Sequence, residues 1–258
     1  MRKIFSLIFI FTITVFCEAQ AAPTETWNSI DGLKRLERSQ FKNDFYQLIN
    51  FYQPQINPLY CTAASSVIIL NAVSENIPSQ KEIEVKAPES LGGNVVEFCS
   101  YSQLNFFNEK TDKIKKRDII ELKAPKQIIN GKEIYDPGLS LADLSQILSK
   151  VYFLKTKIKY AKSNNDKSVK DFRDDLKKYL SDNKNFLIVN FDGKEIGRNV
   201  GGHMSPLAAY DEASDSVLVL DVALHRGAWY WVQILDLYRA MNSKDGDLYR
   251  GYIIISKS

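Results

Sequence analysis

The sequence changes character near its middle, and this change restricts the possible folds more than any other feature. In the first half, apolar residues recur at the spacing of one helix face, as in the series Leu33, Leu36, Phe41, Phe45 and Leu48. In the second half, short apolar and aromatic runs predict strands, at residues 156–160, 186–191, 204–210, 217–222, 229–234 and 251–256. We therefore expect an α+β fold in which a helical lobe is followed by an antiparallel β-sheet lobe.

The expected helices follow from the same spacing and from helix start signals. Ser140 stands just before a segment with apolar residues at helical spacing, and Asp143 comes three residues after Ser140. This is a capping-box pattern. The predicted helices cover residues 33–51, 61 to about 74, pieces within 95–107, 141 to about 152, 168–180 and 236–241.

Composition is that of an ordinary globular protein. Of the 258 residues, 45% are hydrophobic and 25% are charged, and this length can bury a full core. The formal net charge of +3 is too small and too dispersed to indicate a nucleic-acid partner.

The first residues have the pattern of a signal peptide. Two basic residues precede an apolar run from Ile4 to Phe16, and Ala19-Gln20-Ala21 provides a small-x-small cleavage site. The apolar run is too short for a comfortable transmembrane helix. We expect residues 1–21 to be removed, and residues 22–258 to form a single domain without a membrane span, periplasmic or secreted.

Cys61 is the strongest candidate for a catalytic residue. It opens an apolar, helix-forming stretch, and Pro58 disfavours any earlier helix nearby. A thiol in the first turn of a helix feels the positive end of the helix dipole, which favours the thiolate. Gln55, six residues upstream, can fold back toward the sulfur on the predicted loop. This arrangement suits acyl transfer, with Gln55 and the Cys61 backbone N–H forming an oxyanion hole.

A disulfide between Cys61 and Cys99 is the main alternative, because these are the cysteines left after the predicted cleavage. Such a bridge would abolish the nucleophile. Cys61 stands at a helix start with a donor glutamine before it, whereas Cys99 lies in an ordinary Glu-Phe-Cys-Ser sequence. We expect Cys61 to be a free thiol.

Two histidines are available as a base for this thiol. His203 lies among glycines at the start of a predicted strand, whereas His225 lies in a predicted surface turn. Asp221 closes another predicted strand, and if the two strands are neighbours, Asp221 can fix the tautomer of His203. The chain order Gln55, Cys61, His203, Asp221 then matches a papain-like site with a thiolate–imidazolium pair.

Several motifs together resemble the phytochelatin synthase (glutathione γ-glutamylcysteinyltransferase) family, in its short prokaryotic form. They are Gln55-x5-Cys61, Gly201-Gly-His-Met-Ser-Pro-Leu-Ala-Ala-Tyr210, Val219-Leu-Asp-Val-Ala223 and Arg250-Gly-Tyr-Ile-Ile-Ile-Ser256. The similarity runs from about residue 45 to residue 256. The resemblance implies a papain-like cysteine-protease fold that acts on glutathione.

The resemblance also implies a role for each site residue. Cys61 attacks the Cys–Gly peptide carbonyl of glutathione, Gln55 helps to hold the oxyanion, and His203, oriented by Asp221, protonates the departing glycine. The γ-glutamylcysteinyl thioester on Cys61 then passes to water, giving γ-glutamylcysteine, or to a second glutathione, giving phytochelatin.

The chain departs from the plant pattern just after Asp221. An arginine expected three residues later, to hold a charged substrate group, is replaced by Leu224, and Arg226 is the nearby substitute. Gly202 is a second candidate substrate-binding residue, since glycine lets backbone approach a substrate closely. Because these departures concern the second-substrate site, we predict mainly glutathione deglycination with weaker chain-building transfer.

Metal is expected to enter with the substrate, as Cd²⁺ or Zn²⁺ thiolates of glutathione. Two histidines and two cysteines give no convincing protein metal site, so no tightly bound cofactor is expected. The resemblance also makes a homodimer an expected assembly.

Two other function classes fit part of the pattern. Another papain-like cysteine peptidase, such as one that cuts after a double-glycine leader, would use the same Cys61, His203 and Asp221. A non-catalytic thiol- or metal-binding module is the other alternative, and it leaves the order of the site residues to coincidence.

Overall fold

A computed structural model describes residues 24–74, 81–123, 127–129, 132–134 and 138–257. The predicted signal peptide at residues 1–21 lies outside these ranges.

An antiparallel sheet of seven strands forms the centre of the molecule, in the order β1-β10-β9-β8-β7-β13-β6. All of its pairings are antiparallel, and β8 is the middle strand. The strands are β1 (Thr24–Thr26), β6 (Lys155–Tyr160), β7 (Asn185–Asp192), β8 (Gly202–Asp211), β9 (Ser216–Val219), β10 (Tyr230–Gln233) and β13 (Gly251–Ser256).

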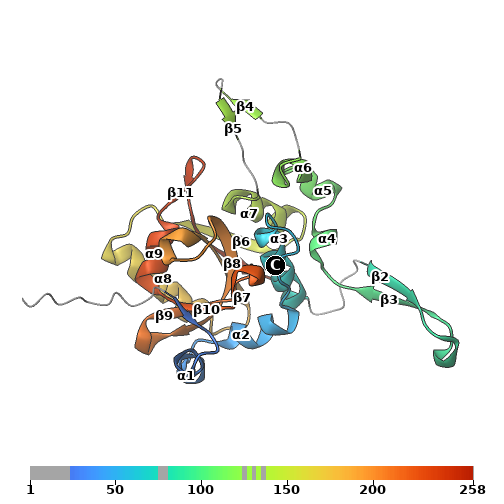
Figure 1. Cartoon of the computed structure of the whole chain (residues 1–258), viewed down its shortest axis with the longest axis horizontal. Coiled ribbons are helices and arrows are strands. Elements are labelled where there is room, and N and C mark those ends of the chain that lie inside the picture. The colour runs from blue at the N-terminus through green and yellow to red at the C-terminus, as the bar shows by residue number, and fades with distance from the viewer. Residues whose placement is uncertain (1–23, 75–80, 124–126, 130–131, 135–137, 258) are drawn as a thin grey trace, which may run out of the picture.

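Helices cover both faces of this sheet (Figure 1). One face packs against α3 (Cys61–Val73) and α7 (Leu141–Lys150), and the other against α8 (Asp166–Tyr179) and α9 (Ile234–Met241). Consecutive residues of β7 enter opposite cores, with Phe186 and Ile188 on the α3 side and Leu187 on the α8 side. The predicted α+β class and antiparallel sheet are confirmed, and so is the Ser140–Asp143 capping box of α7.

The helix predicted over residues 33–51 is wrong in its middle. The chain forms α1 (Ile30–Arg38), α2 (Asn43–Leu48) and a 3-10 turn (Ile49–Phe51). Phe41 is extended between them, and its carbonyl accepts a hydrogen bond from the backbone N–H of Tyr210 at 2.8 Å. Pairing with the end of β8 therefore replaces one helical turn.

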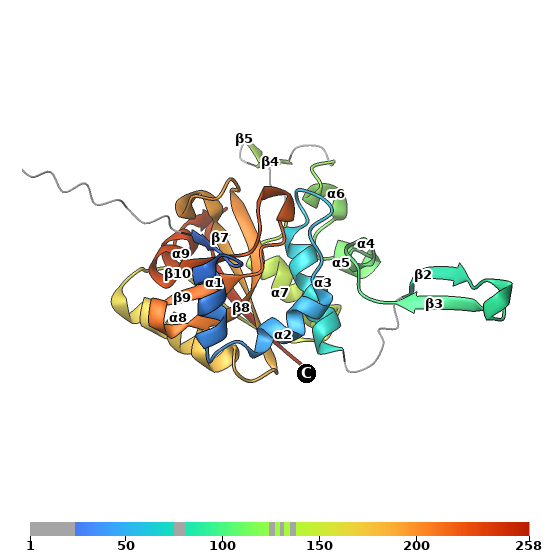
Figure 2. The ribbon, with the colours of Figure 1, turned by 60° about the horizontal axis from the view of Figure 1, so that its bottom comes forward.

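The helical pieces predicted within residues 95–107 are also partly wrong. Only α4 (Gln103–Phe106) is helical there, because β3 (Val95–Cys99) pairs with β2 (Lys81–Lys86). The β-branched pair Val95–Val96 favours a strand, and Gly92 and Gly93 adopt the positive φ angles that the connecting turn requires. Figure 1 and Figure 2 both show this hairpin projecting away from the sheet.

Short elements complete the described chain. They are α5 (Glu109–Asp112), α6 (Arg117–Ile120), the paired strands β4 (Gln127–Ile129) and β5 (Lys132–Ile134), the paired strands β11 (Lys244–Asp245) and β12 (Leu248–Tyr249), and 3-10 turns at Glu89–Leu91, Gly193–Ile196, Glu212–Ser214 and Leu224–Arg226. Over the residues described, none of the helices has the length and apolar character needed to cross a bilayer.

Candidate active site

Cys61 is the first residue of α3, with Tyr60 at the N-cap. The side chain is half-buried, while the helix behind it is buried on nearly all sides. The helix is fixed against β8 by the Ser65 hydroxyl, which donates to the carbonyl of Met204 at 3.1 Å. The apolar sequence of α3 therefore places the thiol at a helix N-terminus, directly over the middle strand of the sheet.

His203 and Asp221 come together because β8 and β9 are neighbours. Asp221 lies two residues beyond the end of β9, and its Oδ1 is 2.8 Å from Nε2 of His203. Both side chains are buried. The Ala223 backbone N–H also donates to Asp221 Oδ1 at 2.8 Å, which fixes the carboxylate. The predicted contact between the two residues is present.

The charges of the site favour a thiolate. Burial raises the pKa of the Cys61 thiol. The hydrogen bond and charge of His203, the Met204 backbone N–H and the Thr62 hydroxyl together lower this pKa by more than burial raises it. Burial lowers the pKa of His203, yet hydrogen bonds to Asp221 and Cys61 raise it to about 9. The net directions, a lowered thiol pKa and a raised imidazole pKa, favour a thiolate–imidazolium pair.

The orientation of the ring assigns a task to each nitrogen. Nε2 of His203 faces Asp221 and the Ser205 hydroxyl, which is 3.1 Å away. Nδ1 is therefore the nitrogen left to exchange a proton with the Cys61 sulfur. Sequence reasoning missed Ser205, although its position two residues after His203 on a strand puts it on the same face of the sheet.

Arg198 is a second residue that sequence reasoning missed. Its Nη2 lies 3.6 Å from Oδ2 of Asp221, and its guanidinium carbon lies 4.3 Å from the ring centroid of Tyr230. No motif or periodicity marks this arginine in the sequence, because it lies in the irregular segment between a 3-10 turn and β8.

Gln55 lies beside the segment that carries Asp221. Its backbone N–H donates to the carbonyl of Val222 at 2.8 Å, and its side-chain amide donates to the carbonyl of Asn57 at 2.9 Å. On its other side, the same segment is bonded to β8, since Leu220 N–H donates to Pro206 and Val222 N–H to the Ser205 hydroxyl. A primary amide has two N–H donors, so one of them is left for an oxyanion.

The two candidate substrate-binding residues have structural partners. A Cβ at Gly202 would lie 2.7 Å from Nη1 of Arg250, so this guanidinium would have to shift to admit a side chain. Arg226 is exposed, and its guanidinium donates to the carbonyl of Asn199. Their roles in substrate binding stay predictions. His225 is exposed, as expected.

The thiols and the acidic side chains complete the inventory of the described chain. Cys61 and Cys99 are free cysteines, which agrees with the expected free thiol at Cys61. No group of three or more His, Cys, Asp or Glu side chains within the described ranges is arranged to hold a metal ion.

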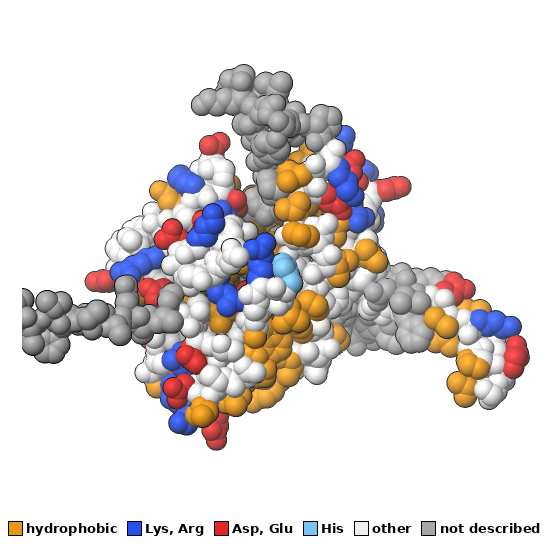
Figure 3. Space-filling model, viewed as in Figure 1, with side chains coloured by type: hydrophobic (Ala, Val, Ile, Leu, Met, Phe, Trp, Pro, Cys, Tyr) orange, Lys and Arg blue, Asp and Glu red, His pale blue; other side chains and the backbone are white. Residues whose placement is uncertain are grey.

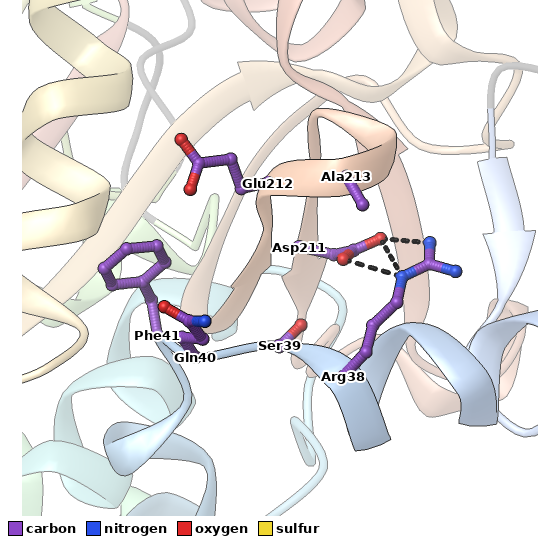
Figure 4. A pocket seen from close by; sticks show the side chains of 7 residues that line it. All are labelled: Arg38, Ser39, Gln40, Phe41, Asp211, Glu212 and Ala213. Carbon is purple, nitrogen blue, oxygen red and sulfur yellow. Dashed lines mark hydrogen bonds and ion pairs between the residues drawn. The ribbon is translucent and has the colours of Figure 1, made fainter.

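A cavity of about 350 Å³ lies at the other end of β8 (Figure 4). Arg38 reaches across it from α1 to Asp211, whose oxygens lie 2.9 and 3.1 Å from Nε of Arg38. This cavity is separate from Cys61 and contains none of the candidate catalytic residues. On another face, a surface histidine lies beside basic side chains above a band of apolar side chains (Figure 3).

Comparison with known proteins identifies the family of the chain. The sequence model of the family described as phytochelatin synthase matches residues 20–252. The "Glutathione gamma-glutamylcysteinyltransferase 3" of Lotus japonicus is 30% identical over 217 residues, which cover 83% of this chain and 37% of the relative. The "Glutathione gamma-glutamylcysteinyltransferase 1" of Arabidopsis thaliana is 26% identical over 216 residues, with the same coverage. The chain thus spans little more than a third of the length of these relatives. Because the family model extends over nearly all of it, the chain belongs to the phytochelatin synthase family.

Proposed function

We propose that this chain catalyses cysteine-dependent acyl transfer on glutathione, cleaving the Cys–Gly bond. The observation that carries the proposal is the position of His203, which contacts the ionised Asp221 through Nε2 and acts on the Cys61 thiol from its other side. The names of the relatives supply the substrate. The comparisons do not favour the alternative of a double-glycine leader peptidase.

In the first half-reaction, the Cys61 thiolate attacks the carbonyl carbon of the Cys–Gly bond, and the carbonyl electrons move to oxygen. The second amide N–H of Gln55 and the Cys61 backbone N–H hold this oxyanion. When the carbonyl re-forms, the C–N bond breaks and His203 gives its proton to the departing glycine nitrogen. A γ-glutamylcysteinyl thioester is left on Cys61.

In the second half-reaction, water or the amine of a second glutathione attacks the thioester, and His203 accepts the proton. The thiolate of Cys61 leaves, and the product is γ-glutamylcysteine or phytochelatin. Leu224 is 49% exposed and carries no charge, and Arg226 is already bonded to Asn199, so the acceptor site lacks an unoccupied cation at these positions. We expect hydrolysis to dominate for this reason.

Further parts of the proposal concern the surroundings of the reaction. A helix N-terminus carrying the thiol, packed on an antiparallel sheet carrying the imidazole, supports a papain-like fold in one domain over residues 22–258. Cd²⁺ or Zn²⁺ enters as glutathione thiolates rather than as a bound cofactor, and two chains associate as a homodimer. The leader pattern at residues 1–21 supports export to the periplasm or secretion.

The test is release of glycine from glutathione by the purified protein, with and without cadmium, resolved by mass spectrometry. We expect glycine in slight excess over γ-glutamylcysteine, because each transfer to a second glutathione also releases a glycine, and we expect fewer oligomers than γ-glutamylcysteine. If ordinary peptides are cleaved and glutathione is not, the substrate assignment is wrong. If oligomers exceed free γ-glutamylcysteine, the proposed preference for water is wrong.

A further inference from the structure

Arg198 occupies an enclosed position behind the site. Its side chain is 17% exposed, and its guanidinium lies over the ring of Tyr230. Gly227 is also close to the guanidinium, since a Cβ there would lie 2.8 Å from Nη2 of Arg198. Gly227 also has a φ angle of +142°, which L side chains rarely adopt. The aromatic ring and the missing Cβ together leave a space shaped for a guanidinium.

The oxygen that faces this guanidinium is the one His203 does not use. Oδ1 of Asp221 accepts hydrogen bonds from His203 and from the Ala223 backbone N–H. Oδ2 is buried and has no hydrogen-bond partner among the described residues. Nη2 of Arg198 lies 3.6 Å from it, beyond hydrogen-bond distance but within the range of an ion pair. Arg198 therefore acts on Asp221 through its charge.

The charges at the site alternate in sign and sum to zero when Arg198 is included. The order is thiolate of Cys61, imidazolium of His203, carboxylate of Asp221 and guanidinium of Arg198. Without Arg198, the buried group would carry a net negative charge, which burial strongly disfavours.

We propose that Arg198 is a positioning residue whose charge, held beside Asp221, sets the pH range in which the Cys61–His203 pair is reactive. The inference rests on the proposed nucleophilic role of Cys61 and not on the identity of the substrate. Arg198 is then the fourth charged side chain of the site, and it acts on the Cys61 sulfur through Asp221 and His203.

The other groups that face Asp221 are neutral. Tyr52 donates its hydroxyl to the Asp221 backbone carbonyl at 2.7 Å, and the Ser205 hydroxyl lies 3.1 Å from the same imidazole nitrogen that faces Asp221. Burial and the charge of Asp221 raise the pKa of Tyr230 well above its ordinary value, so this ring stays uncharged. Arg198 is thus the cation that opposes Asp221 from outside the Cys61–His203 pair.

The sign of the effect follows from charge. Removing a cation stabilises the protonated form of each neighbouring acid. Without Arg198, the pKa of the Cys61 thiol and the pKa of the His203 imidazolium must both rise. A residue with a purely structural role would lower the maximal rate without moving both values in the same direction.

The experiment measures alkylation of Cys61 by iodoacetate against pH, in a Cys99→Ser background. The rate rises as the thiolate forms, and it falls as the imidazolium that attracts the anionic reagent loses its proton. For Arg198→Met we expect the rising limb and the falling limb of this pH–rate profile both to move to higher pH by about 0.5–1 unit. Arg198→Lys keeps the charge and should hold both limbs near their original positions. Arg239→Met, an exposed arginine of α9 paired with Asp236, is the matched control.

Unmoved limbs in Arg198→Met, or limbs that move in opposite directions, would overturn the inference. So would a folded Arg198→Lys variant whose two limbs rise by the about 0.5–1 unit expected for loss of the charge, and this outcome can be read even if Arg198→Met does not fold. Failure of the proposed function looks different. A wild-type thiol with an ordinary pKa would refute the active site itself, whereas a normal profile without glycine release from glutathione would refute only the substrate.

Discussion

The two ends of β8 each hold a buried aspartate with an arginine, but the two pairs are built differently. At the Asp211 end, Nε of Arg38 contacts both carboxylate oxygens at 2.9 and 3.1 Å, and the Ser214 hydroxyl donates as well. At the His203 end, Arg198 stands 3.6 Å from Asp221, and the imidazole takes the other oxygen.

This difference distinguishes a structural ion pair, Arg38–Asp211, from Arg198–Asp221, in which the carboxylate also serves the reactive imidazole. A carboxylate whose oxygens are taken up by a guanidinium has little capacity to orient another group. Asp221 keeps one oxygen for His203 because its arginine acts only at a distance. The two ends lie about 25 Å apart along the strand, so each can be altered without contact with the other.

The largest expected effect tests whether the His203 end is the reactive one. Cys61→Ser should lower glycine release by at least about 1,000-fold, because a serine at this position has no comparably acidic proton. Cys99→Ser should leave the rate within about twofold of wild type. Equal losses in the two variants would show that Cys61 is not the nucleophile.

Asp221→Asn should lower kcat by about 100- to 10,000-fold, because an amide neither stabilises the imidazolium nor fixes its tautomer. Its thermal unfolding should change much less than its activity. The measurement is steady-state glycine release together with circular dichroism. A variant that keeps wild-type kcat would show that the contact between His203 and Asp221 is structural.

Asp211→Asn should show the opposite pattern, with activity near wild type and a loss of about 1–2 kcal/mol in the free energy of unfolding. Burial raises the pKa of Asp211, but the hydrogen bonds from Arg38 and Ser214 lower it by more than burial raises it. The pKa of Asp211 is therefore below its ordinary value. The stability from this pair is therefore present above the unfolded pKa and lost as pH falls through the folded pKa. Denaturant titrations between about pH 5 and pH 2 should show this loss in the wild type and less of it in the variant.

A third buried aspartate sharpens the comparison, because Asp44 of α2 lacks an arginine. Neither of its oxygens has a hydrogen-bond partner within the described structure, and burial, with a contribution from Asp182, raises its pKa from 3.8 to about 9. The unfolded chain loses this proton first, so stability must fall between about pH 4 and pH 9, by up to about 1.4 kcal/mol per unit. Asp44→Asn should flatten that fall, and an unchanged pH slope would contradict the assignment of a neutral Asp44.

The sequence predicted those parts of the site that local patterns determine. The apolar stretch after Cys61 predicts α3, and the long apolar runs predict β7, β8 and β9, so neighbouring strands were enough to bring Asp221 to His203. Long-range pairing determines the rest. Phe41 leaves its helix to bond with Tyr210, and Arg198 reaches Asp221 from an irregular segment, and neither event leaves a periodic signal in the sequence.

The three residues that follow β9 have a consequence of their own. Their backbone is tied to β8 on one side, through Pro206 and Ser205, and to the loop before the helix of the nucleophile on the other, through Gln55. One short stretch of backbone thus sets the distance between His203 on β8, which moves the proton, and Gln55, which holds the oxyanion. Lengthening this stretch by a single residue would misplace both groups at once.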